Sequence, residues 1–215
     1  MKFLTLIYES SNTYGTINNY RSAISLICPN EIGQDPNLKR FCKGASNLKP
    51  QAPKYAVTWD PHTVLDFIKN LPSENKISLD ELNKKLSTLL VLATGQRVQT
   101  ISKIRLQNIK IKDDHAIIFI PDKIKTSKVN SIQPTLEFNR FSNEPKICVL
   151  NTLELYLKKT EKLRCANEDF LFISSKKPYK SVSKDSISRW IKDILGKSVI
   201  DTQIFNIYMH SFSII

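Results

Sequence analysis

The sequence is poor in the residues that build metal sites and disulfide frameworks. Among its 215 residues there are 3 His and 4 Cys. The cysteines stand far apart, so that no Cys-x-x-Cys pair exists, at Cys28, Cys42, Cys148 and Cys165. A zinc site needs such ligands at close spacing, and sparse cysteines are typical of reduced thiols inside cells. We therefore expect no metal, no cofactor and no disulfide.

Long apolar runs are missing as well. No stretch approaches the about 20 apolar residues of a membrane-spanning helix. The apolar segment at residues 3–8 is shorter than the core of a secretory signal, which has roughly 7–15 residues. We expect a soluble protein of the cell interior with no membrane partner.

What the sequence does have is an excess of positive charge. Lys and Arg total 32 against 20 Asp and Glu, which gives a formal net charge of +12. Hydrophobic residues make up 41%, enough to form a packed core. The charge excess favours a polyanionic partner, because neutralised phosphates release their counterions. A solvated basic surface without such a partner is the alternative.

The chain divides by pattern into an N-terminal helical unit at 1–50, a proline-containing linker at 51–60 and a larger unit at 61–215. Apolar residues at helical spacing, with Ser, Thr, Asp or Pro at the start, predict the helices. Alternating apolar residues predict the strands. The expected helices are 17–27 with Thr16 as N-cap, one that starts at Asp35-Pro36, one that starts at Asp60-Pro61 and runs through 63–70, and 78–92, 97–103, 149–159 and 184–195. The expected strands are 108–111, 115–120, 131–136 and 170–173.

The most informative segment runs from Ala93 to Ile109, where Thr94-Gly95-Gln96-Arg97 follows the end of a helix. A lysine-bearing loop between strands and the segment Ser188–Lys192 come later in the chain. Taken in this order, these features resemble the tyrosine recombinases (phage-integrase superfamily), and within them the enzymes of eukaryotic mobile elements. The resemblance extends over nearly the whole chain.

This resemblance implies a mainly α fold with a small three-stranded antiparallel sheet, an α+β catalytic domain at 61–215 preceded by a short helical (SAM-like) core-binding segment at 1–50. It implies DNA recombination and integration, in which a tyrosine hydroxyl attacks a phosphodiester without a metal. Arg97 would clamp the phosphate, because a guanidinium is planar and always charged. Lys125 would be the general acid, with Lys123 and Lys128 as alternatives. His210 would open the next motif.

Two departures from the family pattern bear on catalysis. The position three after Arg97, which is acidic in the family, is Thr100. The second arginine of the motif at His210 is replaced by Ser213, and Tyr208 precedes His210, where the family has no nucleophile. We therefore expect a C-terminally truncated catalytic domain that is inactive or impaired by itself.

Double-stranded DNA is the expected partner, with self-association on the DNA, in the nucleus or elsewhere inside the cell. Most contacts in such complexes go to phosphates. The candidate DNA-binding residues are Arg21, Arg40, Lys43, Lys103, Lys128 and Arg189.

Two other hypotheses remain open. One is an active recombinase fragment whose missing residues are supplied in trans or by an extension. The other is a basic helical protein-interaction module without a nucleic-acid role.

Overall fold

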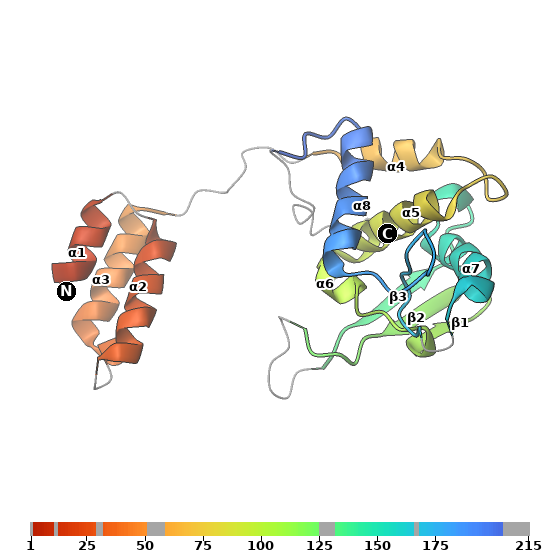
Figure 1. Cartoon of the computed structure of the whole chain (residues 1–215). Helices are drawn as coiled ribbons and strands as arrows, with labels where there is room; N and C mark the ends of the chain where they lie inside the picture. Colours follow the sequence, from red (N-terminus) through yellow and green to blue (C-terminus); the bar gives the residue numbers. More distant parts are fainter. Residues whose placement is uncertain are drawn as a thin grey trace. The chain divides into compact units, whose positions relative to one another are not determined.

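The computed structural model describes residues 2–10, 13–28, 32–50, 59–124, 132–165 and 168–203. The chain forms two compact units, Met1–Val57 and Thr58–Ile215. Figure 1 shows a helical first unit and a helical second unit that contains a small sheet.

The first unit consists of short helices around a thin core. Its fully buried apolar residues among those described are Leu4, Ile17, Leu38, Cys42 and Ala45. Large apolar side chains nevertheless stay exposed, among them Leu6 at 64%, Leu26 at 88% and Ile27 at 82%. So few residues bury little apolar area. The elements are α1 (Lys2–Glu9), α2 (Tyr14–Ile27), η1 (Ile32–Gln34) and α3 (Pro36–Leu48).

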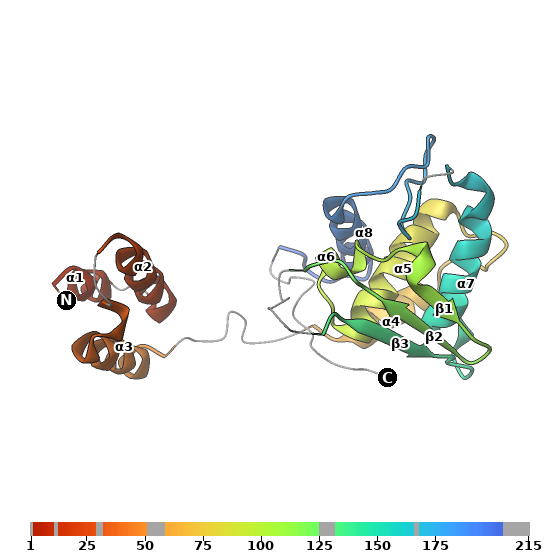
Figure 2. The ribbon, with the colours of Figure 1, turned by 90° about the horizontal axis from the view of Figure 1, so that it is seen from below.

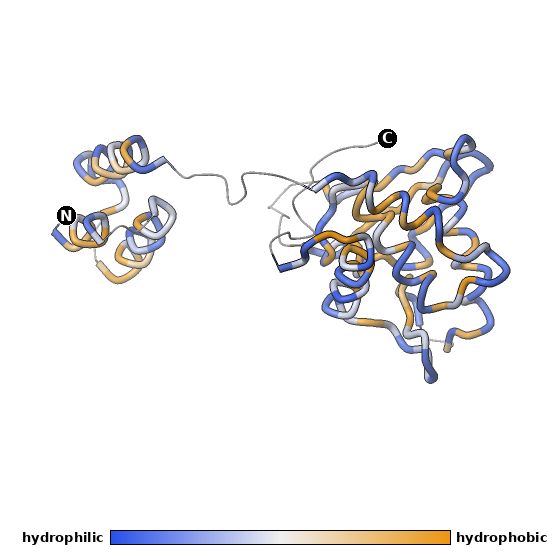
Figure 3. The backbone as a smooth tube through the Cα atoms, turned by 90° about the horizontal axis from the view of Figure 1, so that it is seen from above, coloured by the Kyte–Doolittle hydropathy of each residue, from blue (hydrophilic) through white to orange (hydrophobic). Residues whose placement is uncertain are grey.

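The second unit is built around α5 (Leu79–Thr94), which packs against both α7 and α8. Its leucines recur at helical spacing, and Leu82, Leu86 and Leu90 are fully buried. The other helical elements are α4 (Pro61–Lys69), α6 (Val98–Ile101), η2 (Leu106–Asn108), η3 (Pro145–Ile147), α7 (Val149–Thr160), η4 (Glu161–Leu163) and α8 (Lys184–Lys197). Figure 3 shows that the helices of both units carry apolar as well as hydrophilic residues.

The sheet has three antiparallel strands in the order β1-β2-β3. Ala116 and Ile118 of β2 face Phe138 and Leu136 of β3 across the ladder, and all four are buried. The alternation of buried and exposed residues along β2 and β3 turns one face of the sheet toward the core. Figure 2 shows the strands side by side next to α7. Their bounds are Ile109–Ile111, His115–Phe119 and Thr135–Asn139.

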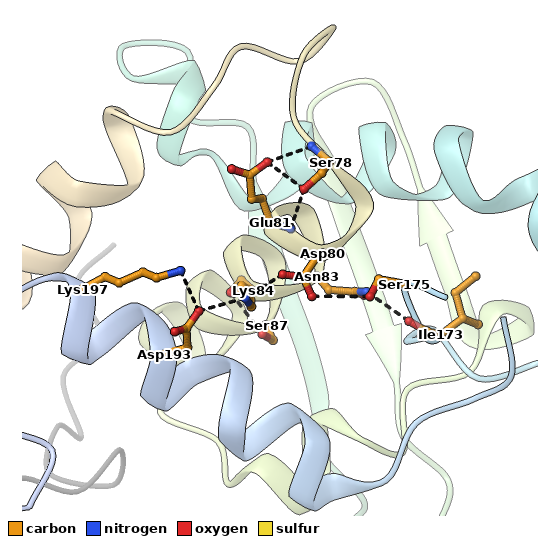
Figure 4. A network of polar contacts seen from close by, with 10 residues as sticks. All are labelled: Ser78, Asp80, Glu81, Asn83, Lys84, Ser87, Ile173, Ser175, Asp193 and Lys197. Carbon is orange, nitrogen blue, oxygen red and sulfur yellow. Dashed lines mark hydrogen bonds and ion pairs between the residues drawn. The ribbon is translucent and has the colours of Figure 1, made fainter. Parts of the chain in front are cut away.

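The start of α5 is fixed by a capping box, which Figure 4 shows from close by. The Ser78 hydroxyl accepts a hydrogen bond from the Glu81 backbone N–H at 3.2 Å, and Glu81 in turn accepts from the Ser78 backbone N–H at 2.9 Å. The Ser78 hydroxyl also donates to the Glu81 carboxylate at 2.7 Å, and this hydrogen bond, together with the one from the Ser78 backbone N–H, lowers the pKa of the Glu81 carboxyl. Two backbone donors that the helix itself leaves free are thereby satisfied.

Polar contacts also connect α5 to its neighbours (Figure 4). The Lys84 ammonium lies 2.6 Å from a carboxylate oxygen of Asp80 and 2.9 Å from one of Asp193, which belongs to α8. The buried Asn83 amide donates to the backbone carbonyl of Ile173 at 3.1 Å and accepts from the Tyr156 hydroxyl at 2.8 Å. Each buried polar side chain of this group has a partner, as a stable interior requires.

The predicted fold class is confirmed, but several boundaries differ. Thr13 rather than Thr16 caps α2. The third strand lies at Thr135–Asn139, after the predicted 131–136, and the predicted strand 170–173 contributes only two isolated bridges. Helix α1 was not predicted, because its eight residues are too few for a clear periodicity.

Candidate nucleic-acid interface

The segment with the sequence signature forms a tight turn between two helices. Gly95 ends α5 in the left-handed region, at φ 60°, where a side chain would be strained. The Thr94 hydroxyl donates to the Leu90 carbonyl at 2.6 Å and accepts from the Gln96 backbone N–H at 3.2 Å. Arg97 follows as the N-cap residue of α6. The backbone of Arg97 is thus held by a well-bonded turn.

The guanidinium of Arg97 is exposed and makes no hydrogen bond or ion pair with any residue that the structure describes. Other arginines of the same unit are engaged. Arg140 binds Glu154 at 2.7 Å, and Arg164 donates to the backbone carbonyls of Phe170 and Leu171. Because a guanidinium has five donors, an exposed one on a fixed turn is available to an external anion.

Arg105 differs from Arg97, because its guanidinium binds other groups of the protein. Its guanidinium binds Asp122 at 3.2 Å and Asp169 at 3.6 Å, and it lies 4.5 Å from the ring centroid of Phe170. The hydrogen bond with Asp122 raises the pKa of Arg105, and burial opposes this. Arg105 therefore joins η2 to the chain that leaves β2 and to the segment before Leu171. Sequence reasoning missed this role, because the two acids are distant in sequence.

A hollow of about 360 Å³ lies between α6, Phe170 and the start of α8. Lys103 and Lys184 both line it, together with Gln99 and Ser183. Ser183 is the N-cap of the 14-residue α8, so the positive end of that helix also faces this region. Two ammonium groups and a helix N-terminus favour a phosphate group. Lys184 and Gln99 were not among the predicted DNA-binding residues. The helix predicted to start at residue 184 could have pointed to Lys184, because a helix N-terminus favours anions.

The predicted DNA-binding cations differ in their exposure and in whether they already bind other groups of the protein. Lys103 also forms a long ion pair of 3.8 Å with Asp122, so it is only partly available. Arg189 is exposed on α8 and donates to the Ser186 hydroxyl at 3.2 Å. In the first unit, Arg40 and Lys43 are exposed one turn apart on α3, while Arg21 is half-buried on α2.

Several predicted residues lie outside the described part of the chain: Lys125, Lys128 and His210. Thr100, which stands where the resemblance calls for an acid, is 2% exposed. The described residues nearest to Lys125 are Lys123 and Ile124, and Ile124 is buried. Lys125 follows Asp122, the carboxylate that binds Arg105, by three residues in the sequence.

The described segments of the chain contain no group of three His, Cys, Asp or Glu side chains that is placed to hold a metal ion. Among their helices, none is long and apolar enough to cross a bilayer.

No protein-family model matches this chain, and no curated protein matches it. Solved structures do. The XerH site-specific recombinase bound to difH substrate in a pre-cleavage complex matches 75% of this chain and 42% of its own, with 14% identity and a TM-score of 0.53. XerH bound to palindromic difH substrate in a post-cleavage complex matches 97% and 57%, with 13% identity and a TM-score of 0.53. XerA recombinase, at 16% identity over 93% of this chain and 76% of its own, has a TM-score of 0.45.

The chain thus spans about half the length of the XerH structures that it matches. At this identity the match concerns the fold. The chain has the α+β fold of a tyrosine recombinase, with helices around one small antiparallel sheet.

Proposed function

We propose that this chain binds double-stranded DNA as a tyrosine-recombinase-type protein, in the recombination or integration of a mobile element. The observation that carries the proposal is Arg97, an exposed guanidinium without a protein partner among the described residues, held on a hydrogen-bonded turn of a recombinase fold. A DNA partner also implies a location where DNA is present, which for a eukaryotic element is the nucleus.

The physical basis is the match between fixed cations and a phosphate backbone. A phosphodiester carries one negative charge, and a guanidinium can donate two parallel hydrogen bonds to its oxygens. The hollow between Lys103, Lys184 and the start of α8 offers a second phosphate position in the same unit. Arg40 and Lys43 would add contacts from the first unit. Such contacts give affinity and register without reading the base sequence.

For this chain by itself we propose DNA binding without cleavage. In the tyrosine recombinases that the sequence resembles, a second arginine and a tyrosine nucleophile complete the site. In this chain Ser213 stands at the position of that arginine. Loss of one phosphate-binding donor lowers an enzymatic rate by about 10²–10³, by analogy with oxyanion holes. The covalent step also needs a tyrosine hydroxyl as nucleophile. A polypeptide that supplied both groups would restore cleavage.

A suicide DNA substrate, nicked so that cleavage traps the protein on the strand, tests this second part. The chain alone should give no covalent adduct while it still shifts the duplex in a gel. An adduct that survives denaturation would refute the inactive state, and the linked tyrosine could then be identified by mass spectrometry.

Self-association on DNA belongs to the same proposal. The XerH substrate of one matching structure is palindromic, and a palindrome presents two equivalent half-sites related by two-fold symmetry. We expect two copies of the chain on a palindromic duplex and one on a single half-site. Analytical ultracentrifugation of each complex gives this stoichiometry.

One observation favours a second candidate function, a protein-interaction module. The exposed apolar residues Leu6, Leu26 and Ile27 belong to the small first unit, and exposed apolar patches often mark interaction sites. This function predicts binding that does not weaken with salt, whereas DNA binding weakens steeply.

A further inference from the structure

A second cavity, on other elements than Arg97, has the properties of a small-anion site. It has a volume of about 220 Å³ and lies between α4, α5, η3, α7 and the loop after α4. Its walls include apolar side chains such as Ile68 and the polar side chains Glu74, Lys85, Lys146 and Asn151. In Figure 1 these helices lie together in the second unit.

Lys85 is buried in the middle of α5, with 9% of its surface exposed. Its ammonium has no hydrogen bond or ion pair with the residues that the structure describes. The neighbouring Lys84 differs, since its ammonium binds two carboxylates at 2.6 and 2.9 Å. Lys159, a lysine of α7, donates to the backbone carbonyl of Ile77 at 2.8 Å. An ammonium on a buried stem, with no protein counter-ion among the described residues, favours an anion in the adjoining cavity.

The charges around Lys85 do not supply that counter-ion. Burial lowers the pKa of Lys85, Glu74, which lines the same cavity, raises it, and Lys146 lowers it. Lys69 also lines the cavity, but its ammonium already lies 3.0 Å from Glu144. Lys85 and Lys146 thus bring two positive charges to the cavity against the one negative charge of Glu74, which forms no ion pair with either lysine.

We propose that this cavity binds a small oxyanion, phosphate or the phosphate of a small phosphomonoester, with Lys85 as its buried ligand and Lys146 as a second cation at the rim. The volume suits a group of a few heavy atoms, since each water in the liquid takes about 30 Å³. A tetrahedral oxyanion accepts several hydrogen bonds at once, and ammonium groups and the Asn151 amide are donors. A cation or an apolar ligand would leave the Lys85 charge unbalanced. This site does not depend on the proposed DNA binding.

The test measures the melting temperature of the full chain in phosphate against chloride, at matched ionic strength and pH 7. A ligand that binds only the folded state raises the melting temperature with concentration. The wild type should gain a few degrees, roughly 2–4 °C, at saturating phosphate. Lys85→Met should abolish this gain, since methionine keeps the length and removes the charge. Lys146→Met should reduce it, and Lys158→Met, an exposed lysine of α7 outside the cavity, should leave it unchanged.

A variant that fails to fold does not weaken the test, because the wild type alone gives a second readout. Phosphate should raise the titration midpoint of a single lysine ¹³Cε resonance, since the bound anion stabilises its ammonium form. Glycerol 3-phosphate that binds more tightly than inorganic phosphate would identify a phosphomonoester, and equal binding would identify the free oxyanion. The proposal is overturned if phosphate shifts no lysine, or if the melting gain persists in Lys85→Met, which would show a general salt effect.

Discussion

The two units of this chain differ in the size of the apolar core that stabilises each of them. In Thr58–Ile215 a single apolar cluster connects α4, α5, α7, α8 and the sheet, and buried polar groups such as Asn83 and Tyr156 are bonded to each other. In Met1–Val57 only five described apolar residues are buried, and leucines at the surface remain uncovered. We therefore expect the larger unit to be stable by itself and the smaller unit to have little stability of its own.

The largest effect should come from the centre of the larger unit. Tyr156→Ala removes a fully buried ring and leaves the Asn83 side chain and the Ile173 N–H without their partner. We expect the free energy of unfolding to fall by about 4 kcal/mol. Urea unfolding followed by tryptophan fluorescence measures this, because Trp59 and Trp190 both belong to this unit. Tyr20→Ala, at a tyrosine 42% exposed in the small unit, is the control and should leave the fluorescence transition in place.

The second effect compares the units as separate polypeptides. We expect residues 58–215 to unfold cooperatively with at least about 5 kcal/mol, and residues 1–57 to have roughly 3 kcal/mol or less. Far-ultraviolet circular dichroism in urea gives both values. Equal free energies of unfolding for the two fragments would show that the exposed leucines do not lower the stability of the small unit.

Removing a helix N-cap should have a smaller effect on stability, and the effect should differ between the two units. Ser78→Ala breaks the capping box of α5 and should lower the free energy of unfolding by about 1 kcal/mol. Thr13→Ala at α2, whose cap bond is longer at 3.4 Å, should have a smaller effect. Because Ser78 lowers the pKa of Glu81 in the folded state, this stabilisation is present above the ordinary pKa and is lost as pH falls through the lowered one. The difference between wild type and Ser78→Ala should therefore shrink in acid, and a constant difference would contradict the role of Glu81.

Exposed cations should change stability least. Arg40→Ala with Lys43→Ala should change the free energy of unfolding by less than about 0.5 kcal/mol. On DNA the pair should reduce the salt dependence, lowering the slope of log K against log[salt] by roughly 2. Lys158→Ala with Lys162→Ala, exposed lysines elsewhere on the second unit, removes the same charge and should leave the slope unchanged.

The sequence predicted well what local chemistry determines. Asp35-Pro36, Asp60-Pro61 and Gly95 lie where the described helices begin or end, because caps and breakers act within a few residues. Apolar periodicity located α5, α7 and α8. These signals located the helices, and the fold class came from the resemblance to tyrosine recombinases.

The features that the sequence did not predict depend on contacts between residues that are distant in the sequence. The strand predicted at 170–173 bridges only Arg105 and Ser181, since its neighbours in space come from loops. The role of Arg105 depends on acids 17 and 64 positions away, at Asp122 and Asp169. The environment of Lys85 likewise needs four other elements. No local pattern contains such information, whereas the Thr94–Arg97 segment that made Arg97 a candidate is local in the sequence.

DNA affinity as a function of salt tests the central claim most directly. A labelled duplex titrated with the whole chain from about 50 to 200 mM salt should show binding that weakens steeply, with a slope set by the number of phosphates contacted. Arg97→Ala should keep most of the affinity, because other cations share the backbone contacts. Undetectable binding at the lowest salt, or binding that salt does not weaken, would contradict a DNA-binding role for this recombinase fold.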